Sequence, residues 1–194
     1  RMQEGAVALV QMAKLADAVR KFRRGGGLYI TYLMHPTTGG ALASWASLGT
    51  VTLAQPGALV GFTGPRVAEV LAGRRLAPEA QRAETLHGAG WVDELVEPML
   101  LRSRIQALLS ILGSSQPVRA GGEAAPTAPP PSSRPPADPW ADIRHVRASE
   151  RFGVRELLAE WGTPFFELHG DRSGRADDGS CLCALARIAG RPLV

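Results

Sequence analysis

A pair of glycines that follows a pair of threonines is the segment best suited to bind a negative charge. The run Thr37-Thr38-Gly39-Gly40 lies between a short apolar stretch and a run of small residues, so we expect it to join a strand to a helix. Without a Cβ atom, glycine lets the backbone approach a ligand closely. The free N–H groups of a first helical turn favour an anion, such as the charge that develops on a thioester oxygen during reaction. The same residues are also typical of a tight connection that binds nothing.

Two histidines are further candidates for chemistry. His35 lies just before the glycine turn, where an imidazole could be catalytic or could simply hydrogen-bond to the backbone. His169 lies between Glu167 and Asp171, and a strand would place these three side chains on one face as metal ligands. Structural hydrogen bonding explains the same pattern, and we expect no metal there.

The glycine turn needs a scaffold, and the sequence before residue 113 predicts alternating strands and helices. Apolar residues at helical spacing predict a helix over residues 3–22 that ends at Gly25-Gly26-Gly27. Apolar runs and turn residues predict strands over 28–33, 51–53, 59–62 and 92–96, and helices over 41–48, from Pro65, over 79–86 and over 99–112. Repeated strand–helix units indicate an α/β protein.

A proline-rich stretch divides the chain. Residues 117–139 hold eight of the fifteen prolines, and such a composition cannot form a helix or a central strand. We therefore predict a disordered linker over residues 113–138, between a first module of residues 1–112 and a second of residues 139–194. The second module begins with a helical pattern, is too short to bury a core of its own, and should open a larger domain.

Composition and charge limit the class of protein. The chain has 194 residues and a net charge of +4, and no apolar stretch approaches the length that crosses a bilayer. It opens without a signal peptide and in the middle of a helical pattern, which suggests a fragment. Basic clusters at residues 20–24 and 74–75 suit phosphate-bearing partners, although solvated helix ends explain any single cluster as well. No nucleic-acid recognition motif accompanies them, so we expect no nucleic-acid binding.

The sulfur-containing residues indicate structure more than chemistry. Cys181 and Cys183 lack a zinc-binding spacing, so we expect free, buried and reduced thiols, in keeping with a cytosolic protein. Three methionines are expected in the core, namely Met2, Met12 and Met99.

Several longer sequence motifs are similar to those of one enzyme family. Before the proline-rich stretch these are Arg1-Met2-Gln3-Glu4-Gly5, Gln11-Met12-Ala13-Lys14, Pro36-Thr37-Thr38-Gly39-Gly40, Gln55-Pro56-Gly57 through Gly64-Pro65-Arg66-Val67, and Gln81-Arg82-Ala83-Glu84. Together they make residues 1–112 resemble the beta subunit of the acetyl-CoA carboxylase carboxyltransferase. After that stretch, Phe166-Glu167-Leu168-His169-Gly170-Asp171-Arg172 and Gly190-Arg191-Pro192 resemble the early part of the alpha subunit.

The resemblance implies a fold and a reaction. The family consists of α/β proteins of the crotonase-like superfamily, a spiral of ββα units that would be incomplete in this chain. Its members transfer a carboxyl group from carboxybiotin to acetyl-CoA and make malonyl-CoA, a precursor of fatty acids and polyketides. Biotin would arrive on a carrier protein charged by a biotin carboxylase, and coenzyme A would be part of the substrate. The resemblance also implies a cytoplasmic oligomer that binds neither membrane nor nucleic acid.

Site residues are implied at the matching positions. Gly39 and Gly40 match the beta-side glycine pair that supplies an oxyanion hole in the family, while a second pair, from the alpha half, is expected outside this chain. We expect Thr38, Gly64 and Arg66 to bind the substrate. Arg66 could contact the phosphates of coenzyme A, form a salt bridge or lie in an interface.

Two other functions stay open. A relative of these enzymes could decarboxylate a malonyl-type thioester or carboxylate another short acyl-CoA. A truncated copy without activity of its own could instead pair with intact subunits. Departures from the family at His35-Pro36-Thr37, Leu48-Gly49-Thr50 and Cys183-Ala184 lie near expected strand ends, where they could change substrate preference or mark a diverged copy.

Overall fold

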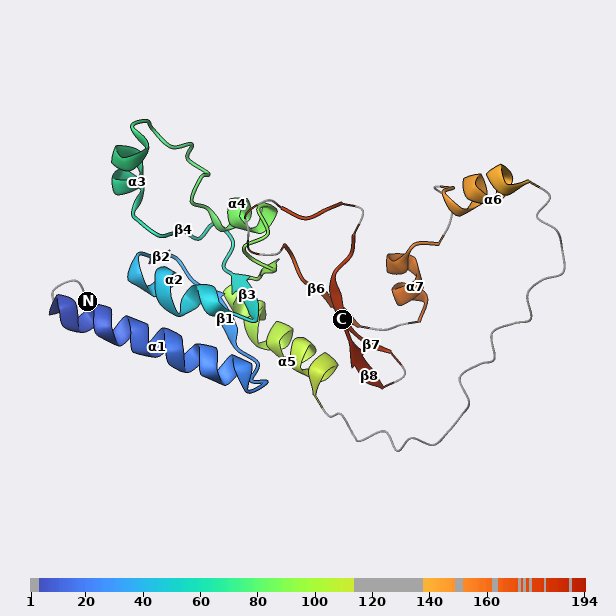
Figure 1. The fold of residues 1–194 in the computed structure, drawn as a ribbon, viewed down its shortest axis with the longest axis horizontal. Helices are drawn as coiled ribbons and strands as arrows, with labels where there is room; N and C mark the ends of the chain where they lie inside the picture. The colour runs from blue at the N-terminus through green and yellow to red at the C-terminus, as the bar shows by residue number, and fades with distance from the viewer. Residues whose placement is uncertain are drawn as a thin grey trace.

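A computed structural model describes residues 4–113, 138–148, 152–161, 164–170, 172, 174, 176–179, 181–188 and 190–194 (Figure 1). Apart from Gly113 and Asp138 at its two ends, the predicted linker lies outside these residues, as do Met2 and Asp171. None of the helices in the described part of the chain combines the length and the apolar character needed to cross a bilayer.

Two small parallel sheets form the first part of the molecule. The first has the order β1 (Ile30–Leu33), β3 (Val51–Ala54) and β5 (Glu94–Leu95), and the second pairs β2 (Thr37–Thr38) with β4 (Val60–Gly61). All four residues of β3 are buried, as expected for a central parallel strand covered on both faces. The predicted strands therefore form, although β4 and β5 are shorter than expected.

The helices carry recognisable start and stop signals. Those of the first part are α1 (Ala6–Arg24), α2 (Gly40–Ser44), α3 (Pro65–Ala72), α4 (Ala83–Gly88) and α5 (Leu101–Leu112), with 3₁₀ turns η2 (Ala46–Leu48) and η3 (Pro98–Leu100). Pro65 occupies the first turn of α3, and Gly73 ends that helix in the left-handed conformation, the usual roles of these residues. The helix predicted over 79–86 begins only at Ala83, because Arg82 is extended and donates to the carbonyl of Gly57.

The C-terminal part adds two helices and an antiparallel sheet. These are α6 (Pro139–Val146), α7 (Val154–Glu160), and the strands β6 (Phe165–Glu167), β7 (Ala184–Ile188) and β8 (Arg191–Leu193) in that order. Asp138 caps α6 by accepting the N–H of Trp140 at 2.9 Å. In Figure 1, α6 and α7 lie away from the body, whereas β6 lies near α4 and β3.

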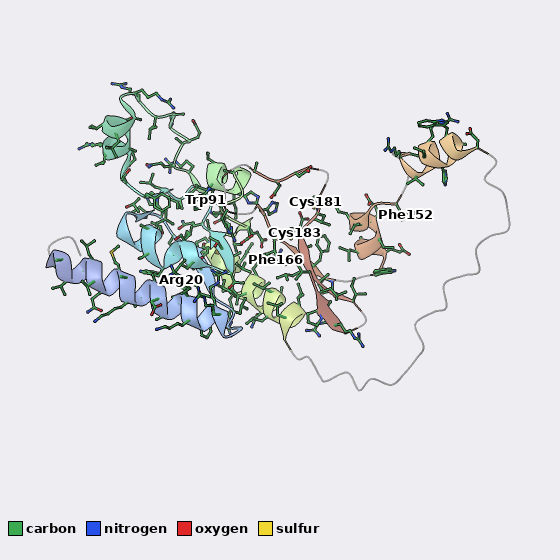
Figure 2. The ribbon with its side chains drawn as sticks, viewed as in Figure 1. Arg20, Trp91, Phe152, Phe166, Cys181 and Cys183 are labelled. Atoms are coloured by element: carbon green, nitrogen blue, oxygen red, sulfur yellow. The ribbon has the colours of Figure 1, made fainter. Side chains whose placement is uncertain are left out.

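The C-terminal sheet has no separate core. Phe166 and Leu185 pack in one cluster with residues of the first part, which are Val51, Leu53, Val96, Leu108 and Ile111. Phe166 is only 1% exposed and lies within the body of the molecule in Figure 2, whereas Phe152 lies beside α7. The buried apolar surface that stabilises β6 and β7 is therefore shared with β3 and α5.

The predicted core position of Met99 is wrong, and that of Met12 is only partly confirmed. Met99 is 93% exposed, because it lies in η3 at the start of α5 and its side chain has no cover from the described residues. Met12 is half-buried on α1, a helix with no fully buried residue that packs against α2 and η2. The apolar spacing of α1 predicted the helix correctly, but not how little of it is covered.

Candidate functional site

The glycine turn is held by the neighbouring strand. Thr37 donates its N–H to Leu59 O at 2.9 Å, and Gly39 donates its N–H to Gly61 O at 3.0 Å. Gly39 has φ of 68°, a conformation that strains any residue with a Cβ, and it precedes α2 directly. The sequence therefore places the chain reversal correctly between a strand and a helix.

The two glycines offer different groups to a ligand. The N–H of Gly39 is already engaged by Gly61, whereas the N–H of Gly40 has no acceptor among the described residues. The carbonyl of Gly40 accepts the hydroxyl of Ser44 at 2.6 Å. Of the predicted pair, Gly40 is thus the residue with a backbone donor left over, and Gly39 sets the turn that orients it.

An apolar groove lies beside Gly40, between α1 and α2. Its volume is about 620 Å³ and its lining consists of Gly5, Ala8, Leu9, Met12, Gly40, Ala41, Ser44 and Trp45. A Cβ on Gly40 would lie 2.9 Å from Met12 Sδ, so the thioether of Met12 occupies the space that the missing side chain leaves. A backbone donor next to an apolar wall is suited to stabilise a negative oxygen.

None of the described side chains that line the groove could act as a general base. Ser44, its one hydroxyl, donates to the Gly40 carbonyl. His35 lies close in sequence, but its ring Nδ1 accepts the backbone N–H of Leu59 at 3.0 Å, and its backbone N–H donates to Gln55 Oε1. The backbone-bonded alternative for His35 is therefore confirmed, and the chemistry available at the turn is electrostatic.

The predicted substrate-binding residues do not form one cluster. Thr38 lies in β2 opposite Gly61 and adjoins the turn. Gly64 and Arg66 lie at the start of α3, which stands apart from both parallel sheets in Figure 1. The Arg66 side chain is exposed and has no hydrogen-bond or ion-pair partner in the part of the chain that the structure describes.

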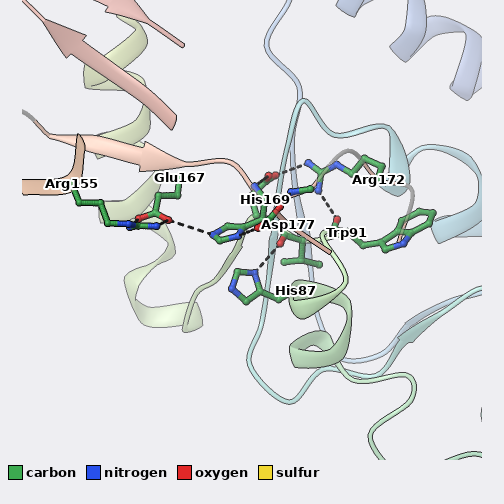
Figure 3. A network of polar contacts seen from close by, with 10 residues as sticks. His87, Trp91, Arg155, Glu167, His169, Arg172 and Asp177 are labelled. Carbon is green, nitrogen blue, oxygen red and sulfur yellow. Dashed lines mark hydrogen bonds and ion pairs between the residues drawn. The ribbon is translucent and has the colours of Figure 1, made fainter. Parts of the chain in front are cut away.

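A polar network, shown in Figure 3, surrounds His169. Nδ1 of His169 lies 2.5 Å from Asp177 Oδ2, and its ring meets the ring of His87 edge-on with centroids 4.6 Å apart. Arg155 binds Glu167 through both carboxylate oxygens, and this hydrogen bonding lowers the pKa of Glu167. Among the described residues, no group of three or more His, Cys, Asp or Glu side chains could hold a metal ion. His169 is therefore hydrogen-bonded to Asp177 within the described residues, while Asp171, the third predicted metal-ligand candidate, lies outside them.

Sequence reasoning missed Asp93. This carboxylate is 2% exposed and accepts hydrogen bonds from Thr52 N–H at 2.7 Å, His169 N–H at 3.0 Å and Arg172 Nη2 at 2.6 Å. Arg172 also donates to Trp91 O at 2.6 Å. The acidic residues Asp93 and Glu94 inside the predicted strand 92–96 were the available signal, because a carboxylate is rarely buried without partners.

The prediction of buried cysteines is wrong. Cys181 and Cys183 are both free and exposed, because β7 begins only at Ala184 and both thiols lie in the irregular segment before it. The carbonyl of Cys183 accepts the N–H of Leu168, so the local role visible here is a backbone one.

Comparisons with known proteins cover the whole chain. The family profile described as "Carboxyl transferase domain" matches residues 1–194. A "Probable biotin-dependent acyl-coenzyme A carboxylase beta3 subunit" from Mycobacterium tuberculosis (strain ATCC 25618 / H37Rv) is 40% identical over 195 residues, which is 100% of this chain and 38% of that protein. An "Acetyl-coenzyme A carboxylase carboxyl transferase subunits beta/alpha" from Salinispora arenicola is 38% identical over 202 residues, 100% of this chain and 35% of that protein.

Two further matches concern the first part of the chain and the fold of the whole. An "Acetyl-coenzyme A carboxylase carboxyl transferase subunit beta" from Syntrophomonas wolfei is 51% identical over 111 residues, 57% of this chain and 39% of that protein. The crystal structure of transcarboxylase 12S with hydrolysed methylmalonyl-coenzyme A bound superposes with a TM-score of 0.65 at 24% identity, over 100% of this chain and 36% of that one. The mixed α/β fold is thus shared with that protein, and the chain spans little more than a third of the length of these relatives.

Proposed function

Because this chain belongs to the carboxyl transferase domain family, we propose that it is the carboxyltransferase part of a biotin-dependent acyl-CoA carboxylase, with acetyl-CoA as the acceptor and malonyl-CoA as the product. Acetyl-CoA is favoured by the 51% identity of the first part to an acetyl-CoA carboxylase beta subunit. A larger acyl group is the second candidate, since the 40% identical relative over the whole chain carries the broader acyl-CoA name.

The observation that carries the proposal is the N–H of Gly40, which has no acceptor among the described residues and lies beside an apolar groove. Carboxybiotin, when bound, supplies the carboxyl group and a basic nitrogen for the acceptor's α-proton, so no side chain of this chain need act as the base. The groove fits such a partner, because its lining offers a donor and apolar walls without a competing charged side chain.

The residues of this chain then act by binding and by charge stabilisation. Gly39 holds the turn, and Gly40 donates its N–H to the oxygen on which negative charge develops. In other enzymes one such donor contributes about 3 kcal/mol to transition-state binding. We assign Thr38, Gly64 and Arg66 to substrate binding, with the Arg66 guanidinium directed at the phosphates of coenzyme A.

The proposed organisation extends beyond this chain. Residues 1–112 are the beta-type part, residues 113–138 a linker, and residues 139–194 the start of an alpha-type part within a crotonase-like spiral of ββα units. A biotin carboxyl carrier protein and a biotin carboxylase are the expected partners in a cytoplasmic oligomer. The second oxyanion donor comes from the alpha-type part beyond these residues.

The test is the reverse reaction in the longest natural polypeptide that contains this chain. Loss of malonyl-CoA that requires biocytin is the expected result. Gly39→Val should abolish it, since valine cannot adopt φ of 68° without strain, whereas Gly88→Ala, at a site with no neighbour within 4 Å of the added Cβ, should not. Release of CO2 without biocytin would indicate a decarboxylase, and binding to intact subunits without turnover would indicate a non-catalytic partner.

A further inference from the structure

We infer that Arg172, which comes from the alpha-type part, is a positioning residue for the Gly39–Gly40 turn of the beta-type part. The inference rests on the proposed function for the meaning of that turn, but the contacts that carry it stand by themselves. They run from Arg172 through Trp91, Phe62 and Gly61, and every step joins described residues.

The first step fixes Arg172 to the loop before β5. Its Nη2 lies 2.6 Å from the buried carboxylate of Asp93, and its Nη1 lies 2.6 Å from Trp91 O (Figure 3). The two backbones also touch, since a Cβ on Gly90 would lie 2.7 Å from the Cα of Gly170. A guanidinium with donors in a fixed planar arrangement can bind both acceptors at once, so Arg172 holds the carbonyl of Trp91, whose N–H donates to Leu86 O at 2.8 Å.

The second step carries that position to the strand beneath the turn. The indole of Trp91 meets the ring of Phe62 edge-on, with centroids 6.1 Å apart, an arrangement that aromatic pairs favour. Arg172, Trp91, Phe62 and Gly61 line a single small cavity together with Leu42 of α2 and Ala46 of η2. Arg172 and the helix that follows the glycine turn therefore both line this cavity.

The third step reaches the turn itself. Phe62 follows Gly61 directly, and Gly61 O accepts the N–H of Gly39 at 3.0 Å. That hydrogen bond engages the Gly39 amide and leaves the Gly40 amide as the donor. A shift of Trp91 and Phe62 would move Gly61 O, and the direction of the Gly40 N–H would change with it.

Hydrogen exchange of the longest natural polypeptide that contains this chain tests the inference without any reaction. In Arg172→Met the amides of residues 36–45 should exchange at least ten times faster than in the wild type, while those of α5 keep their rates. Arg172→Lys should recover part of the protection, because an ammonium can bind Asp93 or Trp91 O but not both in the planar geometry. Arg155→Met is the matched control: it removes an arginine from the same part of the chain, one bound to Glu167 and not to Trp91, and should leave residues 36–45 unchanged.

Two more measurements keep the inference falsifiable. If Arg172→Met does not fold, Phe62→Leu breaks only the aromatic step and should also speed exchange at residues 36–45; wild-type exchange there would overturn the inference. Wild-type exchange in a folded Arg172→Met, or equal acceleration in Arg155→Met, would overturn it as well. In the carboxyl-transfer assay, Arg172→Lys should lower kcat with little change in KM. A wild type without carboxyl transfer would sink the proposed function alone, and the exchange result would stand.

Discussion

The buried carboxylate of Asp93 and the guanidinium of Arg172 form an ion pair of 2.6 Å across 79 residues of sequence. Asp93 adjoins β5 in the first part of the chain, whereas Arg172 follows β6 in the C-terminal part. Because Asp93 also accepts two backbone N–H groups, this one side chain ties together β3, the loop before β5 and the segment after β6.

Replacing Asp93 with asparagine should lower the free energy of unfolding by about 3 kcal/mol, because a partly buried guanidinium loses its counter-charge. Urea denaturation measures the loss. Asp17→Asn is the control, since Asp17 forms an exposed i,i+4 pair with Lys21, and the loss of such a solvated pair should change the free energy of unfolding far less. Equal effects of the two changes would contradict the central position given to Asp93.

Phe166→Ala should destabilise the protein by about 4 kcal/mol through the cavity it leaves. The ring is 1% exposed and also lies under the guanidinium of Arg104, 5.0 Å from the ring centroid. Phe152→Ala, at a ring that is 76% exposed, should change stability by about 0.5 kcal/mol or less. Urea unfolding of both variants measures the loss of stability. Hydrogen exchange of Phe166→Ala then tests the shared core, which requires that the amides of β3 and α5 lose protection together with those of β6.

Gly40→Ala should lower the free energy of unfolding by less than about 1 kcal/mol, because the added Cβ would lie 2.9 Å from Met12 Sδ and the end of that flexible side chain can move away. A double-mutant cycle with Met12→Ala measures the coupling between the two positions, which we expect to be about 0.5 kcal/mol. Gly88→Ala serves as the uncrowded comparison. Additive effects of the Gly40 and Met12 changes would show that the contact between α1 and the turn carries no energy.

The Arg155–Glu167 pair predicts a pH dependence of stability. Hydrogen bonding from Arg155 is the main cause that lowers the pKa of Glu167 below its usual 4.5, with a smaller effect in the same direction from His169. A depressed folded-state pKa means that the stabilisation is fully present above about pH 4.5 and is lost as the pH falls through the lower value. The difference in unfolding free energy between wild type and Glu167→Gln should therefore shrink from pH 6 to pH 3, and a constant difference would refute the assignment.

Local signals predicted the elements well. Pro65 marked the start of α3, the apolar runs marked β1 and β3, and the glycine pair marked the junction of β2 and α2. Each of these depends on the conformational limits of a few neighbouring residues, so a single sequence suffices to see them. The resemblance to the family could also be found from the sequence, because the motifs that carry it are short and contiguous.

The contacts that tune the site could not be predicted in the same way. The pairing of Asp93 with Arg172, and of Gly39 N–H with Gly61 O, joins residues far apart in sequence. The predictions of burial for Met99 and the two cysteines were wrong for a related reason. Their side chains are apolar or neutral, but whether other parts of the chain cover them depends on the whole fold. A residue pattern specifies a local conformation, whereas burial depends on which distant element packs against it.

The distance along the chain between Asp93 and its partners bears on how the protein is made. During synthesis, residues 1–113 leave the ribosome before residues 164–172 exist, and domains fold as units in that direction. Until Phe166 and Arg172 emerge, the face formed by β3 and α5 stays open and the Asp93 carboxylate has no counter-charge. A polypeptide released before residue 166 would therefore display an uncovered apolar face and an unpaired acidic group, the kind of surface that directs a nascent protein to chaperones and proteases.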